Sequence, residues 1–116
     1  MRASYNGFSP KQRRIAGREI NAAVADGRMA WHSFCSVCAT AIGMRHQWHL
    51  EDYRDVLSAY PVCRRCHHAI HVRFAQTDYW QRLLKEVPVA TWVHDLSVDI
   101  VTLTRPFDET YLNGLP

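Results

Sequence analysis

The four cysteines of the chain form two Cys-x-x-Cys pairs, and these pairs constrain the fold more than any other feature of the sequence. The pairs are Cys35/Cys38 and Cys63/Cys66. A two-residue gap lets both thiolates of a pair point at one ion from a tight turn, and two such turns make the four-thiolate tetrahedral site that structural Zn²⁺ prefers. The alternative is two disulfide or redox pairs, but the first ten residues lack the apolar core of a secretory signal. The spacing therefore predicts one structural Zn²⁺ bound by all four cysteines. Reduced cysteines and the lack of a signal-like segment predict a cytoplasmic protein.

Three histidines close to the second cysteine pair are spaced like a further set of metal ligands. His49 precedes this pair, and His67 and His71 follow it. If the segment after the pair is helical, His67 and His71 are one turn apart, so both imidazoles project from one face and can share an ion. The alternative is that Ile70 and Phe74 mark the buried face and the histidines are solvated. The position directly after a cysteine pair favours a second metal site.

Several elements follow one another along residues 35–71: Cys35-x-x-Cys38, His49-x-x-Asp52-Tyr53, Val56-Leu57 and Cys63-x-x-Cys66-His67-x-x-x-His71. With these elements in this order, the segment resembles the zinc-ribbon-containing HNH endonucleases found in phages and bacteria. The resemblance implies an α+β fold with a small ββα-metal core, in which a two-stranded hairpin is followed by a helix beside the four-cysteine zinc site. It also implies DNA cleavage with a second divalent metal (Mg²⁺, Mn²⁺, Ni²⁺ or Zn²⁺) held by His49, His67 and His71.

One position departs from the family pattern. The family has a second histidine after the first metal-binding histidine, as the general base that activates water, and this chain has Leu50. A leucine side chain cannot accept a proton, and losing a general base lowers the rate by a factor of about 10² to 10⁴. The candidate catalytic residues are therefore His49 and two nearby histidines that could replace the base, His46 and His68. On a strand, His46 shares a face with Leu50, opposite to His49, so it would be a displaced base.

The sequence predicts a single domain with three parts: an N-terminal basic helix (1–28), the zinc and ββα core (31–76), and a helix followed by an acidic tail (77–116). Helices are expected at residues 10–26, 64–75 and 78–87, with Ser9 and Thr77 as N-terminal caps of the first and third. Strands are expected at residues 44–50 and 60–62, and near 97–102. No apolar run approaches the roughly 20 residues that a membrane span needs.

Four large aromatic side chains complete the expected packing. Trp80 and Trp92 are expected in the core, because nothing around them is basic enough to guide a nucleic-acid strand. Trp31 and Phe34 are expected to pack near the first cysteine pair.

Basic residues are concentrated in the N-terminal half of the chain. Residues 1–50 hold seven basic and two acidic side chains, whereas residues 86–116 hold one and five. The buried face of the first helix is expected to carry Ala16, Ile20, Ala23 and Val24, with the basic residues on the opposite side. Arginine suits bidentate phosphate contacts, so DNA is the expected partner. The alternative is an ordinary solvated surface. The candidate nucleic-acid contacts are Arg13, Arg14, Arg18, Arg64 and Arg65.

Two functions follow from these features. The first is an HNH-like zinc-binding protein with weak or lost activity as a metal-dependent DNA nuclease. The second is a non-catalytic relative that binds a protein or nucleic-acid partner, such as a phage-encoded regulator or inhibitor. The missing histidine at Leu50 favours the second, whereas the retained ligand spacing of the three histidines favours the first.

Overall fold

The structure is a computed structural model, and it describes residues 5–30, 32–41, 47–87, 90–94, 96 and 98. Several predictions lie wholly or partly outside these residues: Trp31, His46, the first residues of the strand expected at 44–50, nearly all of the strand expected at 97–102, and most of the acidic tail. The described elements are α1 (Pro10–Ala25), β1 (Gln47–His49), the 3₁₀ helix η1 (Val56–Ser58), β2 (Tyr60–Val62), α2 (Arg64–Val72), α3 (Thr77–Glu86) and α4 (Thr91–His94).

The two strands form an antiparallel hairpin that leads directly into α2. Trp48 lies opposite Pro61, and His49 lies opposite Tyr60. Because successive side chains of a strand point to opposite faces, His49 faces one side, while Trp48 and Leu50 pack on the other, against α1. The order of a hairpin, a helix and a nearby four-cysteine cluster confirms the predicted small α+β fold.

The first helix is determined by local sequence signals. The Ser9 hydroxyl accepts a hydrogen bond from the Gln12 amide (3.1 Å), and the Gln12 side chain accepts one from the Ser9 amide (2.8 Å). This reciprocal pair is a capping box, and Pro10 occupies the first helical position. The helix ends before Gly27, whose φ of 84° lies in the left-handed region. The predicted start and end of α1 are therefore confirmed.

The second helix ends earlier than expected, and the third begins and ends one residue earlier than expected. α2 ends at Val72, three residues earlier than predicted, and residues 73–75 form a turn. The prediction that Thr77 caps α3 is wrong, because Gln76 is the cap residue. The Thr77 hydroxyl donates to the Arg73 carbonyl instead (3.3 Å). This bond ties the first turn of α3 to the end of α2.

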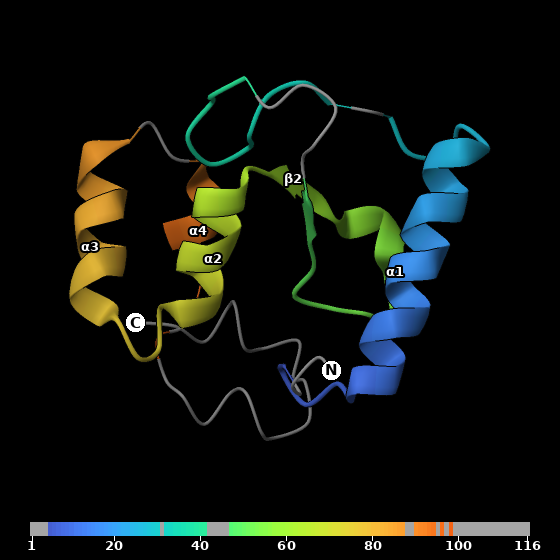
Figure 1. Cartoon of the computed structure of the whole chain (residues 1–116), viewed down its shortest axis with the longest axis horizontal. Helices are drawn as coiled ribbons and strands as arrows, with labels where there is room; N and C mark the ends of the chain where they lie inside the picture. The colour runs from blue at the N-terminus through green and yellow to red at the C-terminus, as the bar shows by residue number, and fades with distance from the viewer. Residues whose placement is uncertain are drawn as a thin grey trace.

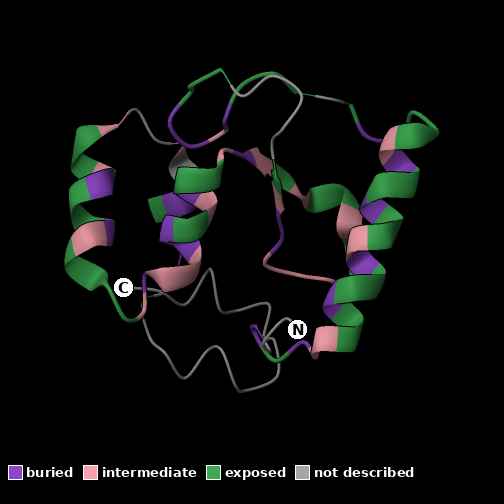
Figure 2. Cartoon of the chain, in the orientation of Figure 1, coloured by how far each residue is buried: buried purple, intermediate pink, exposed green. Residues whose placement is uncertain are grey.

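The hairpin and α2 lie between α1 on one side and α3 on the other (Figure 1). The buried residues of α3 are on its side toward α2, and solvent covers much of the outer surfaces of α1 and α3 (Figure 2). One apolar cluster joins the cysteines to α2, α3 and α4, and it includes Trp80. A second cluster lies between α1 and the β1 side of the hairpin. No helix in the described ranges is long and apolar enough to cross a membrane.

The aromatic predictions have mixed outcomes. Trp80 is 1% exposed, which confirms it as a core residue. Trp92 packs at the edge of the same cluster and stacks on the ring of Tyr60, with centroids 4.1 Å apart. The prediction for Phe34 is wrong: it precedes the first cysteine, yet its side chain is 62% exposed.

Candidate metal centres and a basic cleft

The four cysteines come together at one point. The Sγ atoms of Cys35, Cys38, Cys63 and Cys66 all lie within 4.8 Å of one another, and those of Cys38 and Cys63 are 3.9 Å apart. Zn–S bonds of about 2.3 Å in a tetrahedron place the sulfurs about 3.8 Å apart. All four are free cysteines. The cluster is therefore consistent with structural Zn²⁺.

Backbone amides support both cysteine turns. The amide of Val37 donates to Cys35 Sγ and that of Cys66 donates to Cys63 Sγ, each at 3.4 Å. Such bonds stabilise a sulfur that carries negative charge. The amide of Ser36 donates to a β2 carbonyl at 2.8 Å, which fixes the first turn against the hairpin.

The sulfurs strongly affect one another's ionisation. A hydrogen bond from Cys66 lowers the pKa of Cys35, and the same bond, together with burial, raises the pKa of Cys66. Four thiolates this close repel one another unless a cation lies among them. Burial lowers the pKa of Arg65, but the charge of Cys66 and hydrogen bonds to Cys66 and Cys38 outweigh it and raise that pKa. Arg65 therefore lies beside the cysteine cluster.

The three predicted histidine ligands form a second cluster. One ring nitrogen from each of His49, His67 and His71 lies within 4.8 Å of the other two. The Nε2 atoms of His67 and His71 are 3.0 Å apart, as one helical turn on α2 allows. The structure therefore brings the three predicted ligand side chains together.

In two of these histidines, a neighbouring side chain determines which ring nitrogen has a lone pair available for a metal. His49 Nε2 donates to Glu51 Oε2 at 2.6 Å, and His67 Nδ1 donates to Gln47 Oε1 at 2.6 Å. Each bond places the proton on the nitrogen that carries it, because the partner is an oxygen acceptor. The lone pairs are then left on His49 Nδ1 and His67 Nε2. Metal-binding histidines are held in this way by a carboxylate or carbonyl group.

The third histidine is also kept neutral. Burial, together with the electrostatic effects of His49, His67, Arg13 and Arg73, lowers the pKa of His71 to about 2. A neutral imidazole has a free lone pair, which is the form that binds a metal.

One buried nitrogen of His49 indicates whether the cluster suits a metal ion. Its side chain is 0% exposed, and Nδ1 has no hydrogen-bond partner among the described residues. A buried polar atom without a partner is costly and rare. Three imidazole nitrogens suit Zn²⁺, Ni²⁺ and related ions, so the cluster could hold a second metal.

The sequence analysis missed the network behind His49. Glu51 accepts hydrogen bonds from His49, from the Tyr5 hydroxyl and from the Asn6 amide. The fully buried Arg73 lies 3.7 Å from Glu51 and donates to the Tyr5 oxygen at 2.9 Å. Burial raises the pKa of Glu51, but the hydrogen bond from His49 and the charges of His49 and Arg73 lower it to about 2. Of these residues, only Glu51 could have been expected beside His49 from the sequence. It lies two positions after His49, and residues two apart on a strand share a face.

The position of the missing base, Leu50, and the catalytic candidate His68 both lie away from the histidine cluster. Leu50 is 3% exposed and belongs to the apolar cluster under α1. His68 is exposed on α2 and is not part of the histidine cluster. His46 lies outside the described residues.

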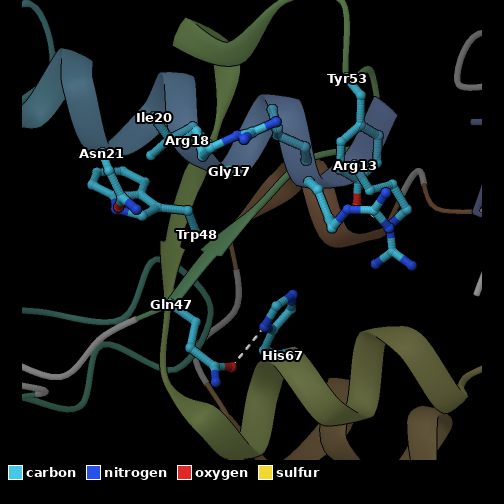
Figure 3. Close-up of a pocket in the computed structure, with 11 residues that line it drawn as sticks. Arg13, Gly17, Arg18, Ile20, Asn21, Gln47, Trp48, Tyr53 and His67 are labelled. Atoms are coloured by element: carbon cyan, nitrogen blue, oxygen red, sulfur yellow. Dashed lines mark hydrogen bonds between the residues drawn. The ribbon is translucent and has the colours of Figure 1, made fainter. Parts of the chain in front are cut away.

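A cleft of about 510 Å³ separates α1 from the hairpin and the start of α2 (Figure 3). Arg13, Arg14 and Arg18 line it from α1, and His67 lines it from α2. The structure therefore brings three of the five predicted nucleic-acid contacts beside one histidine of the cluster. Arg64 does not line this cleft, and neither does Arg65.

The prediction of Arg13 on the solvated face of α1 is wrong. Its side chain is 9% exposed, and Nε donates to the Tyr53 hydroxyl at 3.0 Å. Its guanidinium also lies over the rings of Tyr5 and Tyr53, 5.6 and 5.4 Å from their centroids. Cation–π contacts and a hydrogen bond compensate for the partial burial of the charge.

Comparison with known proteins finds no matching family model, no matching curated protein and no matching solved structure.

Proposed function

We propose that the chain is an HNH-like protein that binds structural zinc and a second divalent metal, contacts the phosphates of nucleic acid, and has weak or lost nuclease activity. The observation that carries the proposal is the position of His67. Its side chain belongs to the histidine cluster and also lines the arginine cleft. A phosphate bound by Arg14 and Arg18 would therefore lie next to the metal ligands.

The roles of the residues follow from this arrangement. Glu51 and Gln47 hold two of the imidazoles, and the arginines bind and orient the phosphate. A divalent ion at the three nitrogens would polarise that phosphate and stabilise the leaving oxygen.

Low activity is proposed because of Leu50. It also lines the cleft, at the position where the resemblance expects the general base. His67 is the one imidazole that lines the cleft in the part of the chain that the structure describes, and it is already a ligand candidate.

Metal content and cleavage are the direct test. Elemental analysis should find at least one zinc per chain, and titration of Mn²⁺ or Ni²⁺ into protein loaded with a single zinc should find one further site that His67→Ala removes. Plasmid nicking with Mg²⁺, Mn²⁺, Ni²⁺ or Zn²⁺ should be slow or absent. Absence of a second binding site would disprove the metal assignment, and rapid cleavage would disprove the low activity.

Phosphate contact has its own test. Arg14→Ala with Arg18→Ala should weaken DNA binding and flatten its salt dependence by about 0.7 to 0.9 in slope for each lost contact. The matched control is Arg82→Ala with Lys85→Ala, which removes the same charge from exposed positions of α3. Equal effects of the two double variants would mean that the cleft is not the contact surface.

The second candidate is a non-catalytic protein that binds a protein partner. Two exposed apolar side chains favour it, Phe34 at 62% and Leu57 at 54% exposure. It becomes the better account if no second ion binds and the cleft arginines have no effect on DNA binding.

A further inference from the structure

A glycine of α1 lies at the cleft. Gly17 lies in the middle of α1, where glycine is less favourable than alanine. A Cβ atom added at Gly17 would meet no atom within 4 Å apart from its chain neighbours and the adjacent backbone of α1, and the residue lines the cleft. A longer side chain at this position would therefore extend into the open space between α1 and the hairpin.

The lining combines an apolar wall with positive charge. Ile20, Trp48 and Leu50 supply apolar surface, and Arg14 and Arg18 supply guanidinium groups. Asn21 and Trp48 both line the cleft, and Arg18 extends along α1 (Figure 3). No carboxylate is among the described residues that line the cleft.

These surfaces suit a nucleotide better than a phosphate alone. An apolar wall would not contribute to the binding of a phosphate alone. A base, by contrast, can stack on aromatic or apolar side chains and accept or donate hydrogen bonds at its edge. The volume of about 510 Å³ is within the range of pockets that enclose small ligands, about 300 to 1,000 Å³. A base in a duplex is paired and stacked, so it can enter such a space only when it is unpaired.

We infer that the cleft binds one unpaired nucleotide of a single nucleic-acid strand. The base lies against Trp48, Ile20 and Leu50, and its phosphate lies on Arg14 and Arg18 beside His67. This inference rests on the proposed function, because that function places the phosphate at the histidine cluster, and it adds the substrate class.

Binding of labelled DNA to zinc-loaded full chain tests the inference. The probes are a 12-nucleotide single strand, the blunt duplex of the same sequence, and free dAMP as a competitor. Fluorescence anisotropy should give at least about tenfold tighter binding to the single strand, since stacking of one base contributes a factor of about 5 to 150. Equal affinity for strand and duplex overturns the inference. Displacement of the strand by dAMP at a concentration within tenfold of the strand's Kd also overturns it, because the ligand would then be a free nucleotide.

A variant that fills the cleft provides the structural test. Gly17→Leu extends a side chain into the open space, and it should lower single-strand affinity about tenfold by excluding the base. Gly17→Ala is the control, because it adds one methyl group and leaves most of the space. Circular dichroism checks that the Gly17→Leu variant is folded. If the folded variant binds the single strand as tightly as wild type does, the inference is overturned.

The two proposals fail in different ways. If duplex and single strand bind equally and both depend on Arg14 and Arg18, the single-strand inference is wrong and the phosphate-contact proposal stands. If Mn²⁺ titration of the same samples finds no second site, the metal part of the proposed function is wrong, whatever the anisotropy shows.

Discussion

His49 Nε2 and Glu51 Oε2 are 2.6 Å apart, and this hydrogen bond determines which nitrogen of His49 can face the other two histidines. The carboxylate of Glu51 holds the proton on Nε2, so the lone pair is on Nδ1, the atom without a described partner. Glu51 is itself held by Tyr5, Asn6 and Arg73. The N-terminal turn at residues 5–8 is therefore part of the support of the histidine cluster.

Removing the charge of Glu51 should weaken binding of the second metal. Glu51→Gln leaves a neutral acceptor that holds the imidazole less firmly and lowers its basicity, and loss of such a partner reduces metal affinity by about 10- to 100-fold. Competition with a chelating dye measures this in zinc-loaded protein. Glu86→Gln, at the exposed end of α3, is the control and should bind like wild type. Unchanged affinity in Glu51→Gln would show that the hydrogen bond does not serve a metal ligand.

The cysteine cluster should determine whether the chain folds. Structural zinc contributes about 10 kcal/mol or more in small zinc-dependent domains, which is comparable with the stability of a whole domain. Cys63→Ser, or removal of zinc by a chelator, should therefore abolish the cooperative thermal transition followed by circular dichroism. Adding zinc back to chelated wild type should restore it, and Cys63→Ser should not recover. A melting temperature unaffected by complete zinc removal would contradict the zinc assignment.

The parts of the fold that follow from local rules could be predicted from sequence. Ser9 and Pro10 define the start of α1, and the spacing of His67 and His71 predicts that they meet on one helix face. These features depend on residues at most a few positions apart, so no knowledge of the tertiary structure is needed.

Contacts between distant segments could not be predicted in the same way. Arg13 shares a face with Ala16 and Ile20, but a charge on a helix is normally solvated, and only the tertiary structure brings Tyr53 within 3.0 Å of it. The pairing of Glu51 with Arg73 depends in the same way on how α2 packs against β1. In both cases the sequence analysis did not predict the burial of a charged group, because the partners that compensate for its burial are remote in sequence.

One strained residue in the first cysteine turn offers a stabilising substitution. Ala39 has a φ of 64°, in the left-handed region that is unfavourable for residues with a Cβ atom. Its amide donates to the Cys35 carbonyl at 2.9 Å, so the conformation is part of the turn. Ala39→Gly should therefore raise the free energy of unfolding by about 1 kcal/mol, measured by urea denaturation of zinc-loaded protein.

The opposite substitution at this position is the control. Ala39→Val adds a β-branched side chain where φ is positive and should lower the free energy of unfolding. If Gly and Val have the same effect, the left-handed conformation is not what limits the stability of this turn.

Restoring an imidazole at position 50 tests whether the rest of a nuclease site is present. Leu50→His places a base on the cleft, on the strand face opposite to His49, where the resemblance expects it. Nicking of supercoiled plasmid should increase by about 100-fold, the low end of what a general base contributes, and a further His67→Ala should abolish the gain. Because Leu50 is buried, folding of the variant must be checked, and Leu50→Asn serves as a polar control of similar shape that cannot act as a base.

A folded Leu50→His protein that binds the second metal and DNA but gains no activity would show that the missing base is not the reason for low activity. Rapid cleavage by wild type that is lost in His46→Ala would instead identify His46 as a displaced base.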